Sequence, residues 1–340
     1  MANINIFPKI NINSETLTEK DVLFISGAGI SAANPTKFAL GSELHELILQ
    51  TFTNLNKSQI DNYLSKSFAL EETCQVIIDQ FEIKNCNLKT GENLGWHILS
   101  ELFSFNNFNT RNDYHCYFRN HLINGGYHIT ANIDQLIESS SPELTKYFSV
   151  ITSNQIEELE FSNGKFNETP RILYKFHGDI NSDPVGAQGF LKNIIEKGFD
   201  AKVKKYWKEL INKVPLVIFI GYGGVDKFDV QPFFEGLNSE EFINTKAIWI
   251  DYGKNLKIEI QTDNEISRLY LSRFTSQLSI KCSPEVILNQ LFDRKYKIIS
   301  AHRIPNKTNP RIKKFLQTNV DKLINKNMLK KLSESFSIKI

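Results

Sequence analysis

The chain has 340 residues, enough for one large core or for one domain with a smaller lobe, and its formal net charge is only +2. This weak charge excludes the strongly basic surface of many nucleic-acid-binding proteins, and no apolar run approaches the roughly 18 residues of a membrane span. The four cysteines never approach CxxC spacing, and residues 1–8 lack the pattern of a signal peptide. We therefore expect a cytoplasmic globular protein with reduced thiols, without a membrane partner.

The first predicted element is a buried strand over residues 22–25, a continuous apolar run that is soon followed by Gly27. A helix is expected from Ser42, and mostly helical patterns over 54–123 predict a helical insertion lobe. A second insertion, helical in its later part, is expected at 181–213. Further strands are predicted at 127–130, 147–152, 171–176, 216–220 and 247–250. The alternation of strands and helices predicts an α/β fold, a Rossmann-like parallel sheet flanked by helices.

The end of the chain differs from the rest. Residues 310–336 carry an apolar stripe at helical spacing, and seven Lys or Arg residues lie on the other face. This pattern predicts a C-terminal amphipathic basic helix within 301–340, after a catalytic domain over 1–300. The helix could pack on its own domain or on a partner subunit, and nucleic acid is less favoured because aromatic residues are not interleaved. We expect a role in assembly or in docking a regulator.

Four short segments rich in polar and glycine residues each follow a predicted strand. They are Gly27–Ser31, Thr130–Asp134, Phe176–Asp179 and Gly221–Asp226. The carboxyl ends of parallel strands lie at one edge of a sheet, where open α/β sheets bind their ligands. The first segment, continued to Ala32, has the G-x-G-x-x-G/A spacing whose backbone N–H groups hold a pyrophosphate. No strand ending in an acidic residue follows about 20 positions on, so we expect a dinucleotide site outside hydride transfer.

In the order of these motifs the chain resembles the sirtuin family, over roughly residues 22–251. The family's glycine loop cradles the NAD phosphates, and the resemblance implies this role for Gly27, Ala28, Gly29 and Ser31. It also implies that Asn132 contacts the nicotinamide ribose, that Asp134 holds the carboxamide, and that His177 is the general base. The remaining expected contacts, on the adenosine half, are Gly221, Tyr222, Asp226 and Asp251.

The chain departs from the deacylating sirtuins at three places. Ala131 stands where they usually carry Gln, and the residues after Ser31 lack their Gly-Ile-Pro-Asp-Phe-Arg continuation. No cysteine occurs between Cys116 and Cys282, so the four-cysteine zinc ribbon of the deacylases cannot be formed there. We therefore expect no zinc. What remains resembles the sirtuin-like NAD hydrolases of bacterial antiphage systems.

The chemistry expected from this resemblance is cleavage of NAD+ to nicotinamide and ADP-ribose. The bond breaks through an oxocarbenium-like state, as in glycoside hydrolysis, and the leaving group departs neutral, so a general acid is not required. A histidine near its ordinary pKa would suit the base at neutral pH. Other readings stay open: a nucleotide-binding sensor without catalysis, a deacylase, an ADP-ribosyltransferase or a cyclase.

Uncontrolled hydrolysis of NAD+ would kill the cell, so we expect the activity to be gated. No sensor domain is recognisable after residue 300, which favours control by homo-oligomerisation or by a separate partner protein. The remaining histidines and the cysteines match no ligand spacing, and we interpret them as structural residues: His45, His97, His115, His121, His128, His302, Cys74, Cys86, Cys116 and Cys282.

Overall fold

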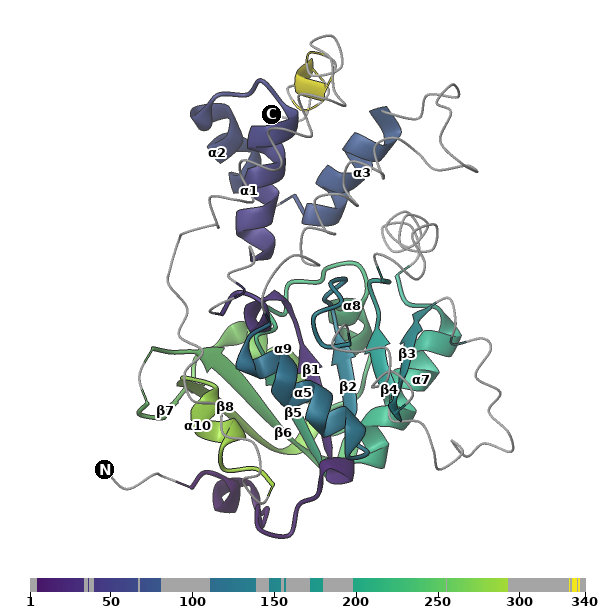
Figure 1. Cartoon of the computed structure of the whole chain (residues 1–340), viewed down its shortest axis with the longest axis vertical. Helices are drawn as coiled ribbons and strands as arrows, with labels where there is room; N and C mark the ends of the chain where they lie inside the picture. The colour runs from purple at the N-terminus through teal and green to yellow at the C-terminus, as the bar shows by residue number, and fades with distance from the viewer. Residues whose placement is uncertain are drawn as a thin grey trace.

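A computed structural model of the chain (Figure 1) provides the structure. It describes residues 5–33, 36, 40–66, 68–80, 111–138, 147–153, 156, 172–179, 198–254, 256–292, 330, 332–334 and 336. No helix in this described part is long and apolar enough to cross a membrane. Cys74, Cys116 and Cys282 are free thiols.

In the described part of the chain, the centre of the fold is a sheet of eight strands in the order β3-β4-β2-β1-β5-β6-β8-β7. All neighbouring pairs are parallel except β7 with β8. The strands are β1 (Val22–Ser26), β2 (Tyr127–Thr130), β3 (Ser149–Thr152), β4 (Ile172–Lys175), β5 (Leu216–Ile220), β6 (Phe242–Tyr252), β7 (Glu259–Ile260) and β8 (Phe274–Cys282). The predicted α/β fold with a largely parallel sheet is confirmed, whereas β7 and β8 were not predicted.

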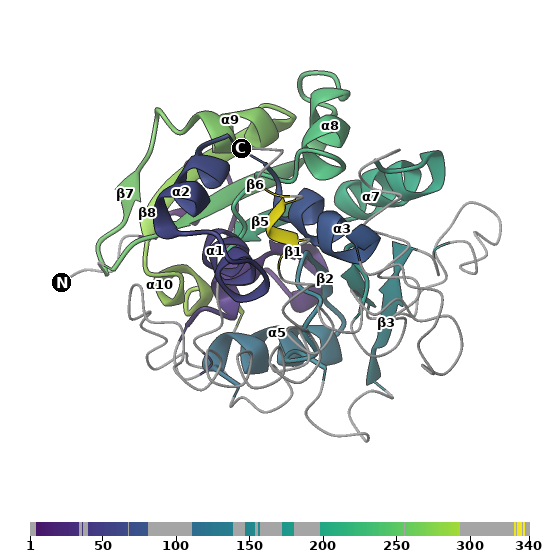
Figure 2. The same cartoon turned by 90° about the horizontal axis from the view of Figure 1, so that it is seen from above.

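Alternate side chains of each central strand enter two separate cores, because successive residues of a strand point to opposite faces. On β1, Leu23 and Ile25 pack with α7 (Ala201–Lys213), α8 (Val230–Glu235) and α9 (Glu265–Leu271). On the other face, Val22 and Phe24 pack with α5 (Asp113–Ile123) and α10 (Glu285–Leu288). Figure 2 shows these helices on the two sides of the sheet. Helices therefore cover both faces, as in doubly wound folds.

Three further helices lie together beyond one edge of the sheet (Figure 1): α1 (Gly41–Phe52), α2 (Lys57–Ser65) and α3 (Leu70–Gln80). His45, Tyr63 and Thr73, one from each helix, are joined by side-chain hydrogen bonds. The helix expected from Ser42 is α1, and it belongs to this group. The predicted lobe over 54–123 is wrong in one respect, because α5 packs on the sheet. Residues 81–110 of that range lie outside the described part.

The described residues of the C-terminal tail pack on the same chain. Leu332 and Phe336 are fully buried, and the Phe336 ring meets Tyr63 of α2 edge-on, with 5.4 Å between ring centroids. The Ser333 hydroxyl accepts a hydrogen bond of 2.7 Å from the backbone N–H of Asn54. At this end of the tail, the apolar stripe thus packs against the α1–α3 group. Residues 301–329 lie outside the described part.

Deleting residues 310–340 is expected to destabilise the chain, because it uncovers Tyr63 and removes the buried side chains of Leu332 and Phe336. Losing a buried Leu and a buried Phe costs several kcal/mol, about 2–5 for each. Urea unfolding followed by circular dichroism measures the loss. A truncated chain as stable as the full one would mean that the tail contributes nothing to the fold.

Candidate active site

The two glycine loops meet between the carboxyl ends of β1 and β5. The chain runs from β1 to strands on one side of it, and β5 lies on the other side, so this is the topological switch point of the sheet. The Gly29 N–H donates to the Gly221 carbonyl at 2.9 Å. A Cβ at Gly29 would stand 2.6 Å from the Gly221 Cα, and Gly221 has a φ of +60°. Glycine is therefore required on both sides of this contact.

The first loop differs from a dinucleotide-binding turn in one respect. After Gly27 the chain forms a short 3-10 helix, Ala28–Ile30, and the first α-helix in the described residues that follow begins at Gly41. The N–H groups of Ile30 and Ser31 donate to the carbonyls of Gly27 and Ala28. The expected helix N-terminus does not directly follow the glycines, so an anion here would depend on loop groups.

Ser31 joins the loop to the predicted Asn132 and Asp134. Asn132 Nδ2 donates to the Ser31 hydroxyl at 3.0 Å, and that hydroxyl donates to Asp134 Oδ2 at 3.0 Å. His115 Nε2 lies 3.0 Å from the same hydroxyl. Burial lowers the pKa of His115 to about 4, so the ring is neutral, and the Asn112 N–H donating to its Nδ1 leaves the proton on Nε2. The Ser31 hydroxyl then has every hydrogen-bonding position filled within the protein.

These bonds fix the Ser31 hydroxyl against Asn132 and Asp134, and the implied contact of Ser31 with the NAD phosphates stays a prediction. Asn132 and Asp134 are 9% and 6% exposed, and Asp134 also accepts from the Leu136 N–H at 3.0 Å. His115, interpreted from sequence as a structural residue, is part of this network. Both predicted side chains are thus held in fixed orientations at the end of β2.

His177 follows β4 and lies among carboxylates. Its Nε2 is 3.1 Å from Asp229 Oδ2 and 3.8 Å from Asp226 Oδ1. Burial alone would lower the pKa of His177, but the Asp229 hydrogen bond and the charges of Asp229, Asp226 and Glu71 outweigh it and raise the pKa to about 9. The expectation of an ordinary histidine pKa is therefore wrong. His177 is an imidazolium at neutral pH.

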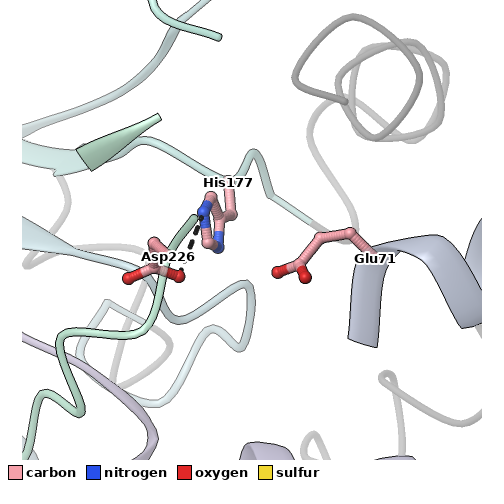
Figure 3. A group of neighbouring side chains, drawn as sticks. All are labelled: Glu71, His177 and Asp226. Atoms are coloured by element: carbon pink, nitrogen blue, oxygen red, sulfur yellow. Dashed lines mark ion pairs between the residues drawn. The ribbon is translucent and has the colours of Figure 1, made fainter. Parts of the chain in front are cut away.

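Glu71, in the first turn of α3, completes this cluster from outside the sheet (Figure 3). One donor atom from each of Glu71, His177 and Asp226 lies within 4.8 Å of the others. Burial raises the pKa of Asp226 to about 7, and the charges of Asp229 and Glu71 act in the same direction. The charge of His177 lowers this pKa but does not outweigh them. One imidazole and two carboxylates are a donor set that divalent cations also accept. Asp226, expected at the adenosine half, thus lies beside the expected base.

The other residues expected at the adenosine half lie toward β6. The Tyr222 ring packs against Trp249 and Tyr270, with 6.0 Å between centroids in each case. Asp251, on β6, accepts from Trp249 Nε1 at 3.0 Å and from Asn264 Nδ2 at 2.5 Å. These two donors occupy both of its carboxylate oxygens, so its position is fixed by the protein.

Sequence reasoning missed Glu71, Asp229 and Lys175, a buried residue at the end of β4. Asp229 had a signal, because it stands three residues after Asp226 in the loop that follows β5. Glu71 had none, since it comes from a helix more than 100 residues before His177. Such contacts depend on tertiary structure.

No family model matches the sequence, and no curated protein matches it. The resemblance to sirtuins stays a prediction that depends on the motifs and their geometry.

Proposed function

We propose that this protein is an NAD+ glycohydrolase that cleaves NAD+ to nicotinamide and ADP-ribose. The observation that carries the proposal is the junction of Gly29 and Gly221 at the switch point, with Asn132, Asp134 and His177 on neighbouring strand ends. Open α/β sheets bind nucleotides at this point, and glycines allow the backbone to approach a pyrophosphate.

In the proposed reaction the bond between ribose C1′ and the nicotinamide nitrogen breaks. Its electron pair stays on the nitrogen, which loses its positive charge, and C1′ takes oxocarbenium character. A water oxygen then bonds to C1′, and its proton passes to a protein base. Asp134 holds the carboxamide, Asn132 orients the ribose hydroxyls or the water, and His177 accepts the proton.

The proton on His177 restrains this reaction at neutral pH. With a pKa of about 9, about one molecule in a hundred has a neutral imidazole at pH 7. Asp226, with a pKa of about 7, is a second group that can take a proton in this range. Low resting activity agrees with a gated effector of antiphage defence that depletes NAD+, controlled by homo-oligomerisation or a separate partner.

Incubation of the purified chain with NAD+, followed by chromatography of the products, tests the proposal. Nicotinamide with linear ADP-ribose supports hydrolysis, and nicotinamide with a cyclic product supports a cyclase. The alternative of a sensor predicts NAD+ binding by calorimetry without nicotinamide release. An acyl-lysine peptide and a protein acceptor, added separately, test for deacylation and ADP-ribosyl transfer. The proposal would be contradicted if the chain neither bound nor cleaved NAD+, both alone and with the products of neighbouring genes.

The activity is expected to rise with pH. Since only the neutral imidazole accepts a proton, kcat/KM should increase about tenfold per pH unit below the His177 pKa of about 9. Asp229→Asn removes the carboxylate that favours the imidazolium, so it should lower this pKa and move the midpoint toward lower pH. Steady-state rates between pH 6 and 10 measure both. An identical midpoint in the variant would exclude His177 as the titrating base.

A further inference from the structure

The side chain of Lys175, the last residue of β4, is completely buried, although lysine is rarely fully buried unless paired. Its Nζ lies 2.7 Å from Glu138 Oε1 and 2.5 Å from Asp179 Oδ2. The side chains of these partners are 8% and 1% exposed. Burial lowers the pKa of Lys175, but the surrounding carboxylates outweigh it and raise the pKa, so the lysine is an ammonium.

The same ammonium also donates to the main chain of the loop that carries Asn132 and Asp134. It lies 2.6 Å from the Asp134 carbonyl oxygen and 3.2 Å from that of Ile133. Gln135, in the same loop, donates to Asp179 Oδ1 at 2.9 Å. Lys175 thus binds the loop directly and also indirectly through Asp179.

The position of Lys175 explains why it can do this. Thr130, the last residue of β2, is paired with Lys175 in the parallel sheet, so both loops leave the sheet side by side. Residues 131–138 contain no strand. The Ala131 N–H still donates to the Ser26 carbonyl, but the Asn132 N–H donates to a side chain, Thr130 Oγ1, and not to a neighbouring strand. His177 follows only two residues after Lys175.

Stability alone does not account for the buried cluster of Lys175, Glu138 and Asp179. Taking an ammonium and two carboxylates out of water is costly, and buried ion pairs often stabilise a fold no more than apolar residues of similar volume. We propose that Lys175 is a positioning residue that fixes the Asn132–Asp134 segment relative to His177. The assignment of these residues to NAD+ cleavage rests on the proposed function.

The test measures loop order and turnover separately. Lys175→Met keeps an unbranched side chain, one atom shorter than that of lysine, and removes its charge. Amide hydrogen exchange of residues 132–138, including the Leu136 N–H bound to Asp134, should become about tenfold faster or more. Turnover of NAD+ should fall about 100-fold, the effect of misplacing a reacting group by about 1 Å.

Two matched controls separate positioning from general damage. Lys208→Met removes a surface lysine paired with Glu241 at 2.9 Å and should change neither readout. Leu173→Ala removes a fully buried apolar side chain from the same strand and should leave turnover intact while the chain is folded. If Lys175→Met does not fold, Asp179→Asn, which leaves the lysine paired with Glu138, should speed exchange of the same amides by a smaller factor.

Unchanged exchange of 132–138 in a folded Lys175→Met or Asp179→Asn variant would overturn the inference. So would NAD+ turnover by folded Lys175→Met at the wild-type rate. If the wild-type chain does not cleave NAD+, the proposed function fails, and the exchange experiment still decides whether Lys175 holds this loop.

Discussion

Replacing Asn132 or His177 by alanine is expected to lower NAD+ cleavage by about 10²–10⁴-fold, the usual cost of removing a positioned base or a group that orients the reactants. Asn132→Ala removes one hydrogen bond to Ser31, for which about 1 kcal/mol of stability is typical. His177→Ala removes the cation from between Asp226 and Asp229. Nicotinamide release measured at pH 8 gives the rates.

His177→Gln makes the second half of this test sharper. A glutamine amide can still donate to Asp229 but cannot take up a proton, so folding is kept and turnover is lost. Asn238→Ala is the control for Asn132, because Asn238 is exposed and its N–H and Nδ2 donate to Glu241 Oε2, three residues away. Turnover by Asn132→Ala or His177→Gln near the wild-type rate would remove these residues from the mechanism.

The sequence predicted the centre of the sheet well and its periphery poorly. Residues 22–25 and 216–220 are continuous apolar runs because β1 and β5 are covered by helices on both faces. β8 was missed because three consecutive polar residues, 275–277, interrupt its apolar pattern, and β7 has only two residues. The pattern of α5 identified a helix but could not say that it packs on the sheet.

The motifs likewise predicted the reactive groups without the contacts that orient them. Ser31 bonds to His115, Asn132 and Asp134, which follow it by 84, 101 and 103 residues. Lysine at the end of an apolar strand gives no sign that it will be buried, and Lys175 was overlooked for this reason. The shifted pKa of His177 comes from charges on two other segments, the loop after β5 and α3, so no local pattern could have revealed it.

The second large effect is expected where the two glycine loops touch. An alanine Cβ at Gly221 would stand 2.7 Å from the Ile30 backbone nitrogen, at a φ of +60°. At Gly29 it would stand 2.6 Å from the Gly221 Cα. Neither neighbour is a flexible side chain, so either substitution must push the loops apart. We expect each to cost about 1–3 kcal/mol of stability, with the crowded loops no longer presenting their backbone to NAD+.

Gly223→Ala in the same loop is the matched control. Its Cβ would meet only Val225 Cγ2 at 3.8 Å, an ordinary contact, and the stability should change by less than about 0.5 kcal/mol. Urea unfolding gives the stabilities, and calorimetry gives NAD+ affinity. Because the two glycines of the contact come from loops almost 200 residues apart, a parallel loss of affinity in Gly29→Ala and Gly221→Ala would indicate one site formed by both. Affinity retained in both, with only stability lowered, would mean that the junction supports the fold and that the nucleotide binds elsewhere.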